Sequence, residues 1–242
     1  MNDVDKYTQL SFVVPYRSDN GGPRDRIFAW TRERIEHFFP DSEIIVGDDN
    51  PDMPFNRSAS LNSAIVRATK EFSVIMDSDT IWAYDLVVDA AGAIDEGRAN
   101  WIIPYGTYTA LNEIGANRVL TSEPESALEF TKGEIEYSKP IWADPITPPV
   151  SGCLVFRTED LFKVGGFDER FIGWGFEDRE FIITCDRIIG SMTRFNSDEV
   201  FHIWHPRGDG DVHQPHYHDN WRRYDQCMAD PGYSFSQERK FI

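Results

Sequence analysis

Short apolar runs alternate with longer stretches of helical periodicity through the first hundred residues. The β-branched run from Leu10 to Val14 is stopped by Pro15, which predicts a buried strand. Between residues 24 and 38 apolar positions recur every three or four residues, which predicts an amphipathic helix. The same reasoning predicts strands at 43–46, 72–76 and 101–103, and helices at 58–70 and 84–95. This alternation is typical of a parallel sheet covered by helices on both faces.

The pattern is weaker at the start of the second half of the chain. Several prolines interrupt residues 104–150, and the one helical stretch there is 124–132, so we expect a linker that crosses the sheet. Beyond it the periodicity predicts a strand from Gly152 to Phe156, a helix from Glu177 to Ile189 and a strand from Glu199 to Trp204. Together these elements predict an α/β fold with a mostly parallel central sheet flanked by helices, in a single domain.

Composition narrows the environment and the partners. With 40% hydrophobic residues among 242, the chain has enough apolar material for a core, which excludes global disorder. The 24 basic and 41 acidic residues give a net charge of −17, which disfavours nucleic acid and anionic membrane surfaces as partners. The three cysteines form no CxxC pair, and no stretch approaches the roughly 18 apolar residues of a membrane span. We therefore expect a soluble, cytoplasmic protein.

The first motif with chemical potential is Asp77-Ser78-Asp79, which directly follows the predicted strand 72–76. Residues two apart at a strand end can project to the same side, so both carboxylates can face one cation. Such hard oxygen ligands suit Mg²⁺ or Mn²⁺, which bind substrate phosphates as further ligands. The alternative is a solvated turn or a helix cap.

Two further residues near strand ends are candidates for nucleotide contacts. Asp49 lies in the acidic turn after the strand 43–46, where its carboxylate could accept from a nucleobase N–H or serve only the turn. Arg57 stands at a predicted helix start, where the helix dipole disfavours a cation. A cation kept there is a candidate partner of a diphosphate, and an ordinary surface arginine is the alternative.

A second motif, Gly173-Trp174-Gly175-Phe176-Glu177-Asp178, combines a glycine-rich loop, one large flat side chain and two carboxylates at a helix start. The helix dipole stabilises carboxylates at that position, which is a sufficient structural reason for them. The functional interpretation is that one of them accepts a proton from an acceptor hydroxyl, in reach of Trp174.

Histidines are concentrated near the C-terminus, since five of the six lie within seventeen residues: His202, His205, His213, His216 and His218. His205, just after the last predicted strand, is the candidate nitrogen ligand for the ion that Asp79 binds. A separate zinc site lacks supporting cysteines, and simple surface histidines are the third interpretation. We expect the histidines after His205 to lie mostly in a loop.

Taken in order, these motifs resemble those of the GT-A glycosyltransferases, most of all the β-1,4-galactosyltransferase and polypeptide N-acetylgalactosaminyltransferase group. The likeness covers about residues 10–206 and departs where Phe176 replaces a glycine of the family pattern. The animal enzymes also have a membrane anchor and disulfides, of which this chain gives no sign. The segments that carry the likeness are Val13-Val14-Pro15-Tyr16-Arg17, Phe55-Asn56-Arg57, Leu61-Asn62, Asp77-Ser78-Asp79, Gly165-Gly166-Phe167-Asp168, Gly173–Asp178 and His205.

The resemblance implies a GT-A (Rossmann-like) domain with a nucleotide-sugar-binding half at about 8–104 and an acceptor-binding half at about 140–242. It implies a hexosyltransferase that takes a nucleotide sugar, with UDP as the expected nucleotide and Mn²⁺ or Mg²⁺ as cofactor. Asp178 would act as general base with inversion, and Glu177 would orient the acceptor. The nucleotide contacts implied are Pro15, Arg17, Asp49, Arg57 and Asp77; the metal ligands are Asp79, His205 and Asp77; and the residues beside the sugars are Trp174, Gly152 and Gly173.

Three other functions fit the same residues. Related enzymes with similar metal ligands retain the anomeric configuration. A nucleotidyltransferase also uses a parallel sheet with an acidic metal pair, and a non-catalytic, metal-dependent sugar-binding module needs no base at all. The sequence names neither the donor sugar nor the acceptor.

Overall fold

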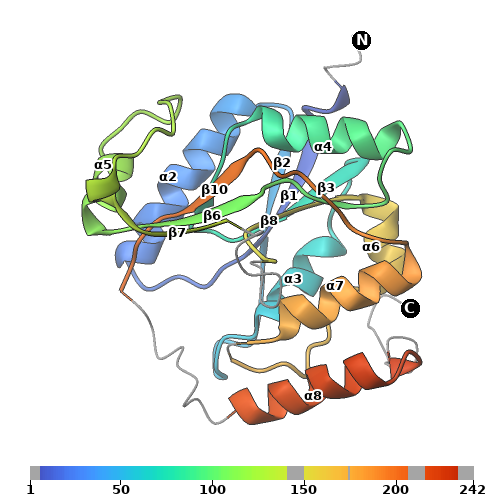
Figure 1. Ribbon diagram of the computed structural model, residues 1–242. Coiled ribbons are helices and arrows are strands. Elements are labelled where there is room, and N and C mark those ends of the chain that lie inside the picture. The colour runs from blue at the N-terminus through green and yellow to red at the C-terminus, as the bar shows by residue number, and fades with distance from the viewer. Residues whose placement is uncertain (1–5, 141–149, 174, 207–215, 234–242) are drawn as a thin grey trace.

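The fold contains two sheets, of which the larger has six strands. The computed structural model describes residues 6–140, 150–173, 175–206 and 216–233 (Figure 1). Strand β8 is antiparallel to both neighbours, whereas the other pairs are parallel, so the prediction of a mostly parallel central sheet is confirmed. The strand order is β2 (Glu43–Gly47), β1 (Leu10–Pro15), β3 (Phe72–Met76), β8 (Cys153–Arg157), β5 (Ile102–Ile103) and β9 (Thr193–Arg194).

Helices cover both faces of this sheet. In Figure 1, α4 (Asp85–Asp95) lies above it, and α3 (Arg57–Ile65) and α7 (Glu177–Ile188) lie below it. The predicted helix at 58–70 ends earlier, at Ile65, while that at 24–38 is found almost as predicted, as α2 (Pro23–Phe38). The short α6 (Thr158–Val164) follows β8 directly.

Residues 104–140, predicted to be part of a linker, instead build half of a second sheet. Its order is β4 (Thr80–Ile81), β10 (Glu199–His202), β6 (Thr107–Leu111) and β7 (Ile135–Pro140). The helix in this region is α5 (Glu113–Leu120), followed by a 3-10 turn at Lys132–Glu134, so the helix predicted at 124–132 is wrong.

Contacts with α2 explain why that stretch is not helical. The Trp30 indole N–H donates to the Ser122 carbonyl at 2.9 Å, and the Arg34 guanidinium donates to the carbonyls of Pro124 and Ser126. These carbonyls are thus bound by side chains of another element, which outweighs the weak helical propensity of the segment.

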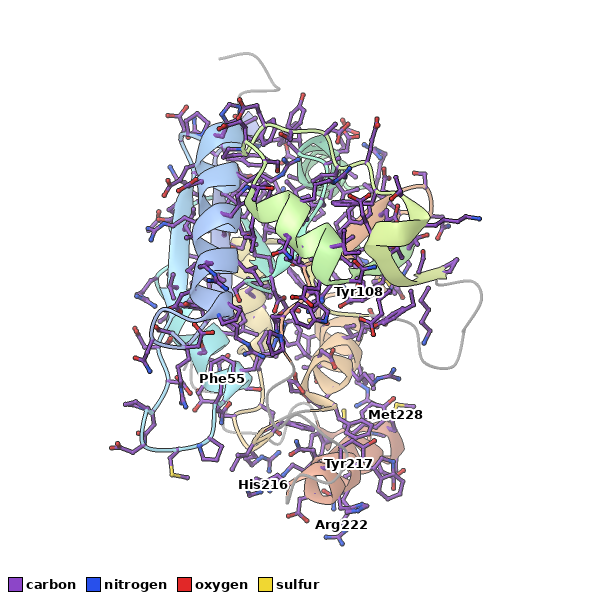
Figure 2. All side chains as sticks on the ribbon, turned by 90° about the vertical axis from the view of Figure 1, so that its left-hand side faces the viewer. Phe55, Tyr108, His216, Tyr217, Arg222 and Met228 are labelled. Atoms are coloured by element: carbon purple, nitrogen blue, oxygen red, sulfur yellow. The ribbon has the colours of Figure 1, made fainter. Side chains whose placement is uncertain are left out.

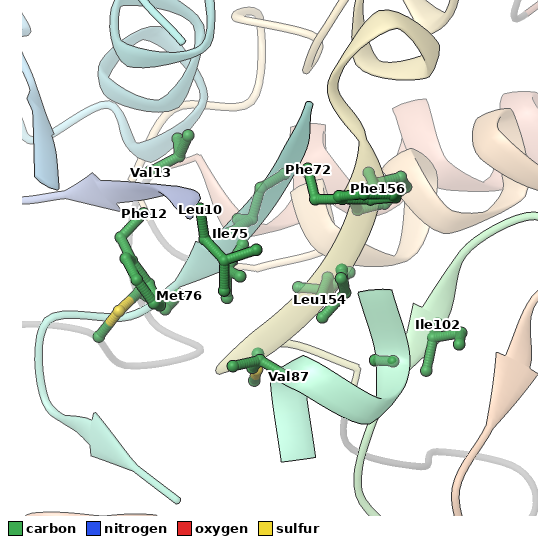
Figure 3. Close-up of a cluster of buried hydrophobic side chains, with 14 of the residues drawn as sticks. Leu10, Phe12, Val13, Phe72, Ile75, Met76, Val87, Ile102, Leu154 and Phe156 are labelled. Atoms are coloured by element: carbon green, nitrogen blue, oxygen red, sulfur yellow. The ribbon is translucent and has the colours of Figure 1, made fainter. Parts of the chain in front are cut away.

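The core of the larger sheet is apolar and closely packed, as Figure 3 shows for side chains from β1, β3, β8 and α4. The rings of Trp101 and Phe156 stack at 5.2 Å and 7°. Cys153, Cys185 and Cys227 are buried and free. Within the described ranges, every helix is too short or too polar to cross a bilayer.

The C-terminal part contains a helix that the sequence did not predict. Residues expected to lie in a loop form α8 (Tyr217–Ala229), which includes His218 and is preceded by His216. His213 lies outside the described residues. Figure 1 shows α8 running beside α7, at the edge of the molecule.

Candidate functional site

One carboxylate and two imidazoles meet where the two sheets join. Asp79 lies between β3 and β4, and β4 pairs with β10 so that Thr80 is opposite His202. The Ile203 N–H also donates to the Asp79 carbonyl at 2.8 Å. The Asp79 Oδ2 atom therefore lies 3.1 Å from Nε2 of His205 and 3.7 Å from Nε2 of His202. These three side chains can each offer one ligand atom, and the atoms all lie within 4.8 Å of one another.

The charges of this group are those of a cation site. Burial raises the pKa of Asp79, but the neighbouring His202 and His205 outweigh it and hold that pKa at about 2. The hydrogen bond with Asp79 raises the pKa of His205. The His205 Nδ1 atom lies 3.0 Å from the Pro206 carbonyl, which fixes the ring and leaves Nε2 facing Asp79. A divalent cation would take the place of the positive charge that the imidazoles supply in its absence.

Asp77, the other acidic residue of the motif, is engaged by Arg57. The Arg57 Nε and Nη2 atoms donate to the same Asp77 oxygen at 3.1 Å and 2.6 Å. Asp77 is not among the three grouped metal-ligand side chains, so its role as a metal ligand remains a prediction.

Arg57 also connects this strand end to the start of α7. Its Nη1 atom lies 3.9 Å from Glu177 Oε1, and the guanidinium lies 5.9 Å above the Phe167 ring. Phe167 is in turn fixed by Asn62, whose side-chain amide bonds both its N–H and its carbonyl, at 2.8 Å and 2.9 Å. The segments around residues 57–62 and 165–168 are thus joined by one buried amide.

Glu177 and Asp178 form a coupled acidic pair beside that cation. Burial and the charge of Asp178 raise the pKa of Glu177 to about 7, although Arg57 opposes the shift. Burial also raises the pKa of Asp178, again opposed by Arg57. Among the described atoms, Arg57 Nη1 and Glu177 Oε2 are buried without a hydrogen-bond partner. Buried polar atoms that lack partners and belong to neighbouring side chains are typical of a ligand site.

The glycines predicted near the sugars lie on either side of this region. Gly152 is buried with φ of +93°, and its carbonyl accepts from the Thr80 hydroxyl at 2.7 Å, next to the metal-ligand group. Gly173 has φ of +70° and begins the turn before α7. Trp174 lies outside the described residues. The roles of all three residues stay predictions.

The predicted base-binding corner is a compact hydrogen-bonded unit after β1 and β2. Pro15 ends β1, and Arg17 forms an ion pair with Asp49 and donates to the carbonyls of Asn50 and Met53 at 2.7 Å and 2.8 Å. The Asp49 side chain is only 4% exposed. The Phe55 ring lies 5.5 Å from the Arg17 guanidinium carbon and is labelled in Figure 2.

Comparison with known sequences finds one matching family. A family model described as the N-terminal domain of galactosyltransferase matches residues 132–206. That segment includes Glu177, Asp178 and both histidines of the metal-ligand group. No curated protein matches the sequence.

Solved structures match the fold over most of the chain. A Drosophila β1,4-galactosyltransferase 7 variant, in complex with manganese, UDP-Gal and xylobiose, is 13% identical over 88% of this chain and 79% of that chain, with a TM-score of 0.52. S. aureus TarS 1–349 with UDP is 15% identical over 91% of this chain and 64% of that chain, with a TM-score of 0.53. GalNAc-T7 with UDP, GalNAc and Mn²⁺ is 12% identical over 90% of this chain and 47% of that chain, with a TM-score of 0.51.

The chain has the GT-A glycosyltransferase fold. The family match over residues 132–206 and this fold make the chain similar to glycosyltransferases of the galactosyltransferase and N-acetylgalactosaminyltransferase group. The fold predicted from the order of the motifs is confirmed, while the division into two functional halves stays a prediction.

Two residues near the candidate metal site were not assigned to it from the sequence. His202 joins the metal-ligand group, and its spacing of three residues from His205 was the available signal. Arg24, in the first turn of α2, lies close enough for its charge to lower the pKa of both Asp79 and His205. Nothing in its local sequence separates it from the other arginines of that helix.

We predict that the stability of this protein depends on pH because of the acidic pair Glu177 and Asp178. Because the folded protein raises the pKa of Glu177 from 4.5 to about 7, folding favours the protonated form, and that stabilisation is lost as the pH rises through this range. Between pH 5 and pH 8 the wild type should therefore lose about 1 kcal/mol or more of unfolding free energy beyond the loss in Glu177→Gln.

Denaturant unfolding at the two pH values measures this difference. Glu159→Gln, in which an exposed carboxylate on α6 is replaced, is the matched control and should follow the wild type. Equal losses in the wild type and in Glu177→Gln would contradict the raised pKa.

Proposed function

We propose that the protein transfers a sugar from a UDP-linked donor to an acceptor hydroxyl, with Mn²⁺ as cofactor and inversion at the anomeric carbon. The observation that carries this proposal is the place of Arg57, which pairs with Asp77 at the end of β3 and also approaches Glu177 at the start of α7. Because Asp79 is two residues from Asp77, this contact supports one site that includes both the metal-ligand group and the acidic pair, where a donor and an acceptor could meet.

Asp79, His202 and His205 would hold the ion. One carboxylate and two imidazoles are a mixed oxygen and nitrogen set, which suits Mn²⁺ better than the all-oxygen preference of Mg²⁺. When bound, the ion offsets negative charge on the diphosphate leaving group. Manganese is present in two similar structures, which supports this choice.

The nucleotide would lie across the ends of β1, β2 and β3. In this arrangement Pro15, Arg17 and Asp49 contact the base and ribose, with Arg17 and Asp49 held rigid by their ion pair. Arg57, Asp77 and the exposed Arg24 face the diphosphate side, where the cations compensate for the charge of −17 on the whole chain. UDP-Gal in one similar structure and UDP in two others support UDP as the nucleotide.

Asp178 would act as the general base and Glu177 would orient the acceptor. Asp178 takes the proton of the acceptor hydroxyl, the freed oxygen attacks the anomeric carbon, and the bond to UDP breaks on the opposite face. The raised pKa of Asp178 makes it a stronger base than an ordinary aspartate. Trp174, Gly152 and Gly173 are assigned to the walls around the two sugars.

The base assignment predicts a separation of turnover from binding. Asp178→Asn should lower UDP release from UDP-galactose or UDP-N-acetylglucosamine with Mn²⁺ by about 10²–10⁴-fold, because the nucleophile keeps its proton. UDP affinity by calorimetry should stay within about twofold, since Asp178 faces the acceptor. Asp89→Asn, an exposed position on α4, is the control.

Unchanged turnover in Asp178→Asn would refute this residue as base. Proton NMR of the first product formed from the UDP-linked α-sugar should show the β-anomer, and an α-anomer would establish retention instead.

The metal assignment predicts weaker binding of Mn²⁺ in two variants. Loss of an outer partner of a ligand already costs about 10–100-fold in metal affinity, so His202→Ala and His205→Ala should each weaken Mn²⁺ binding by at least about tenfold. Free Mn²⁺ measured by electron paramagnetic resonance gives the affinity. His37→Ala, at an exposed position on α2, should bind as the wild type does. Wild-type affinity in His202→Ala would remove that residue from the site.

A further inference from the structure

The residue before the acidic pair has an unusual backbone conformation. Phe176, the N-cap of α7, has φ of +75° and ψ of −11°, in the left-handed region. Among the described residues other than glycine, Asn20 is the one other with positive φ. A bulky aromatic residue avoids this region, and the pattern that this sequence resembles has a glycine there. Such a conformation persists only where the surroundings fix it.

The surroundings that fix Phe176 come from α8. Its ring packs against Tyr217, with ring centroids 5.3 Å apart, and stacks on Tyr224, with centroids 5.4 Å apart and planes at 26°. The two tyrosines are seven residues apart, so they lie two turns apart on one face of α8. Figure 2 labels Tyr217 on this helix.

A second contact from α8 holds the other end of the same turn. Asn220 is 1% exposed, and its side chain accepts from the Ile172 N–H at 3.4 Å and donates to the Ile172 carbonyl at 3.0 Å. Between these points, a Cβ added at Gly175 would meet the Tyr217 ring at 3.5 Å, which is an ordinary contact distance. The helix α8 therefore fixes the chain both before and after the glycines.

The conformation of Phe176 decides where the two carboxylates lie. Glu177 and Asp178 follow it directly, and the Glu180 N–H donates to the Phe176 carbonyl at 3.0 Å in the first turn of α7. Arg57, which they approach, belongs to α3, so their distance from it depends on how α7 begins. A change of φ at Phe176 would turn both carboxylates relative to this cation.

We propose that Phe176 is a positioning residue, and that α8 sets the catalytic geometry through it. The ring, held by Tyr217 and Tyr224, keeps the left-handed turn that places Asp178 at the acceptor. This inference rests on the proposed role of Asp178. It assigns a function in the reaction to a helix that contributes none of the metal ligands or carboxylates described above.

The test compares variants that separate the ring from the backbone strain. Phe176→Gly removes the ring and relieves the strain, Phe176→Ala removes the ring and keeps the strain, and Tyr224→Leu removes the stacking partner. Tyr224→Phe keeps the stacking and is the conservative rescue. Tyr84→Leu, which removes a half-exposed tyrosine stacked on Phe38 at 5.3 Å, is the matched control.

UDP release from UDP-galactose or UDP-N-acetylglucosamine with Mn²⁺ gives kcat and the KM for the donor, and melting temperatures show whether each variant is folded.

We expect kcat to fall by about 10²-fold in Phe176→Ala and Tyr224→Leu, the loss that a misplacement of about 1 Å can cause, and less in Phe176→Gly. KM for the donor should stay within about twofold, since the nucleotide contacts lie on other elements. Tyr224→Phe and Tyr84→Leu should match the wild type.

Wild-type kcat in both Tyr224→Leu and Phe176→Ala would refute the positioning role. A rise in the KM for the donor as large as the fall in kcat would refute it as well. These results concern this inference alone if Asp178→Asn is inactive in the same assay. Absence of UDP release by the wild type from every sugar nucleotide would instead refute the proposed function.

Discussion

The candidate site depends on one buried cation. Arg57 stands at the start of α3, where both the helix dipole and burial disfavour a positive charge. Burial lowers its pKa, yet the charges of Asp77, Glu177 and Asp178 outweigh this and raise it above its usual range. Breaking such a cluster would leave an uncompensated charge in the interior, so the three carboxylates and the arginine hold one another in place. Two segments separated by a hundred residues, the end of β3 and the start of α7, are fixed relative to each other by this contact.

The parts of the fold that sequence reasoning predicted are those in which the local pattern is strong. Strands β1 and β3 are mostly apolar and are buried over their whole length, and α2 buries positions that its periodicity marked, including Ile27 and Ile35. The same reasoning predicted Asp77 and Asp79 as site residues, because ligands of a parallel sheet bind at the carboxyl ends of its strands. Asp178 is at a helix start, where a sequence motif and a structural position coincide.

The parts that it missed are fixed by contacts distant in sequence. The second sheet consists of short strands with polar residues, and its register, not its composition, brings His202 beside Asp79. The segment 122–126 is held by side chains of α2, which no local pattern reveals. The contacts of α8 with Ile172 and Phe176 likewise join residues more than forty positions apart. They explain physically how Phe176 can occupy a position at which the family pattern has a glycine.

The central claim is that the group formed by Asp79, His202 and His205 binds a cation that in turn binds the diphosphate of a nucleotide. Calorimetric titration of UDP into the wild-type protein, once with Mn²⁺ and once with a chelator, tests it most directly. The account predicts saturable binding of one UDP per chain with Mn²⁺, and binding at least about tenfold weaker, or about 1.4 kcal/mol, in the chelator. Equal UDP affinity in the two titrations, or no binding of UDP in either, would contradict it.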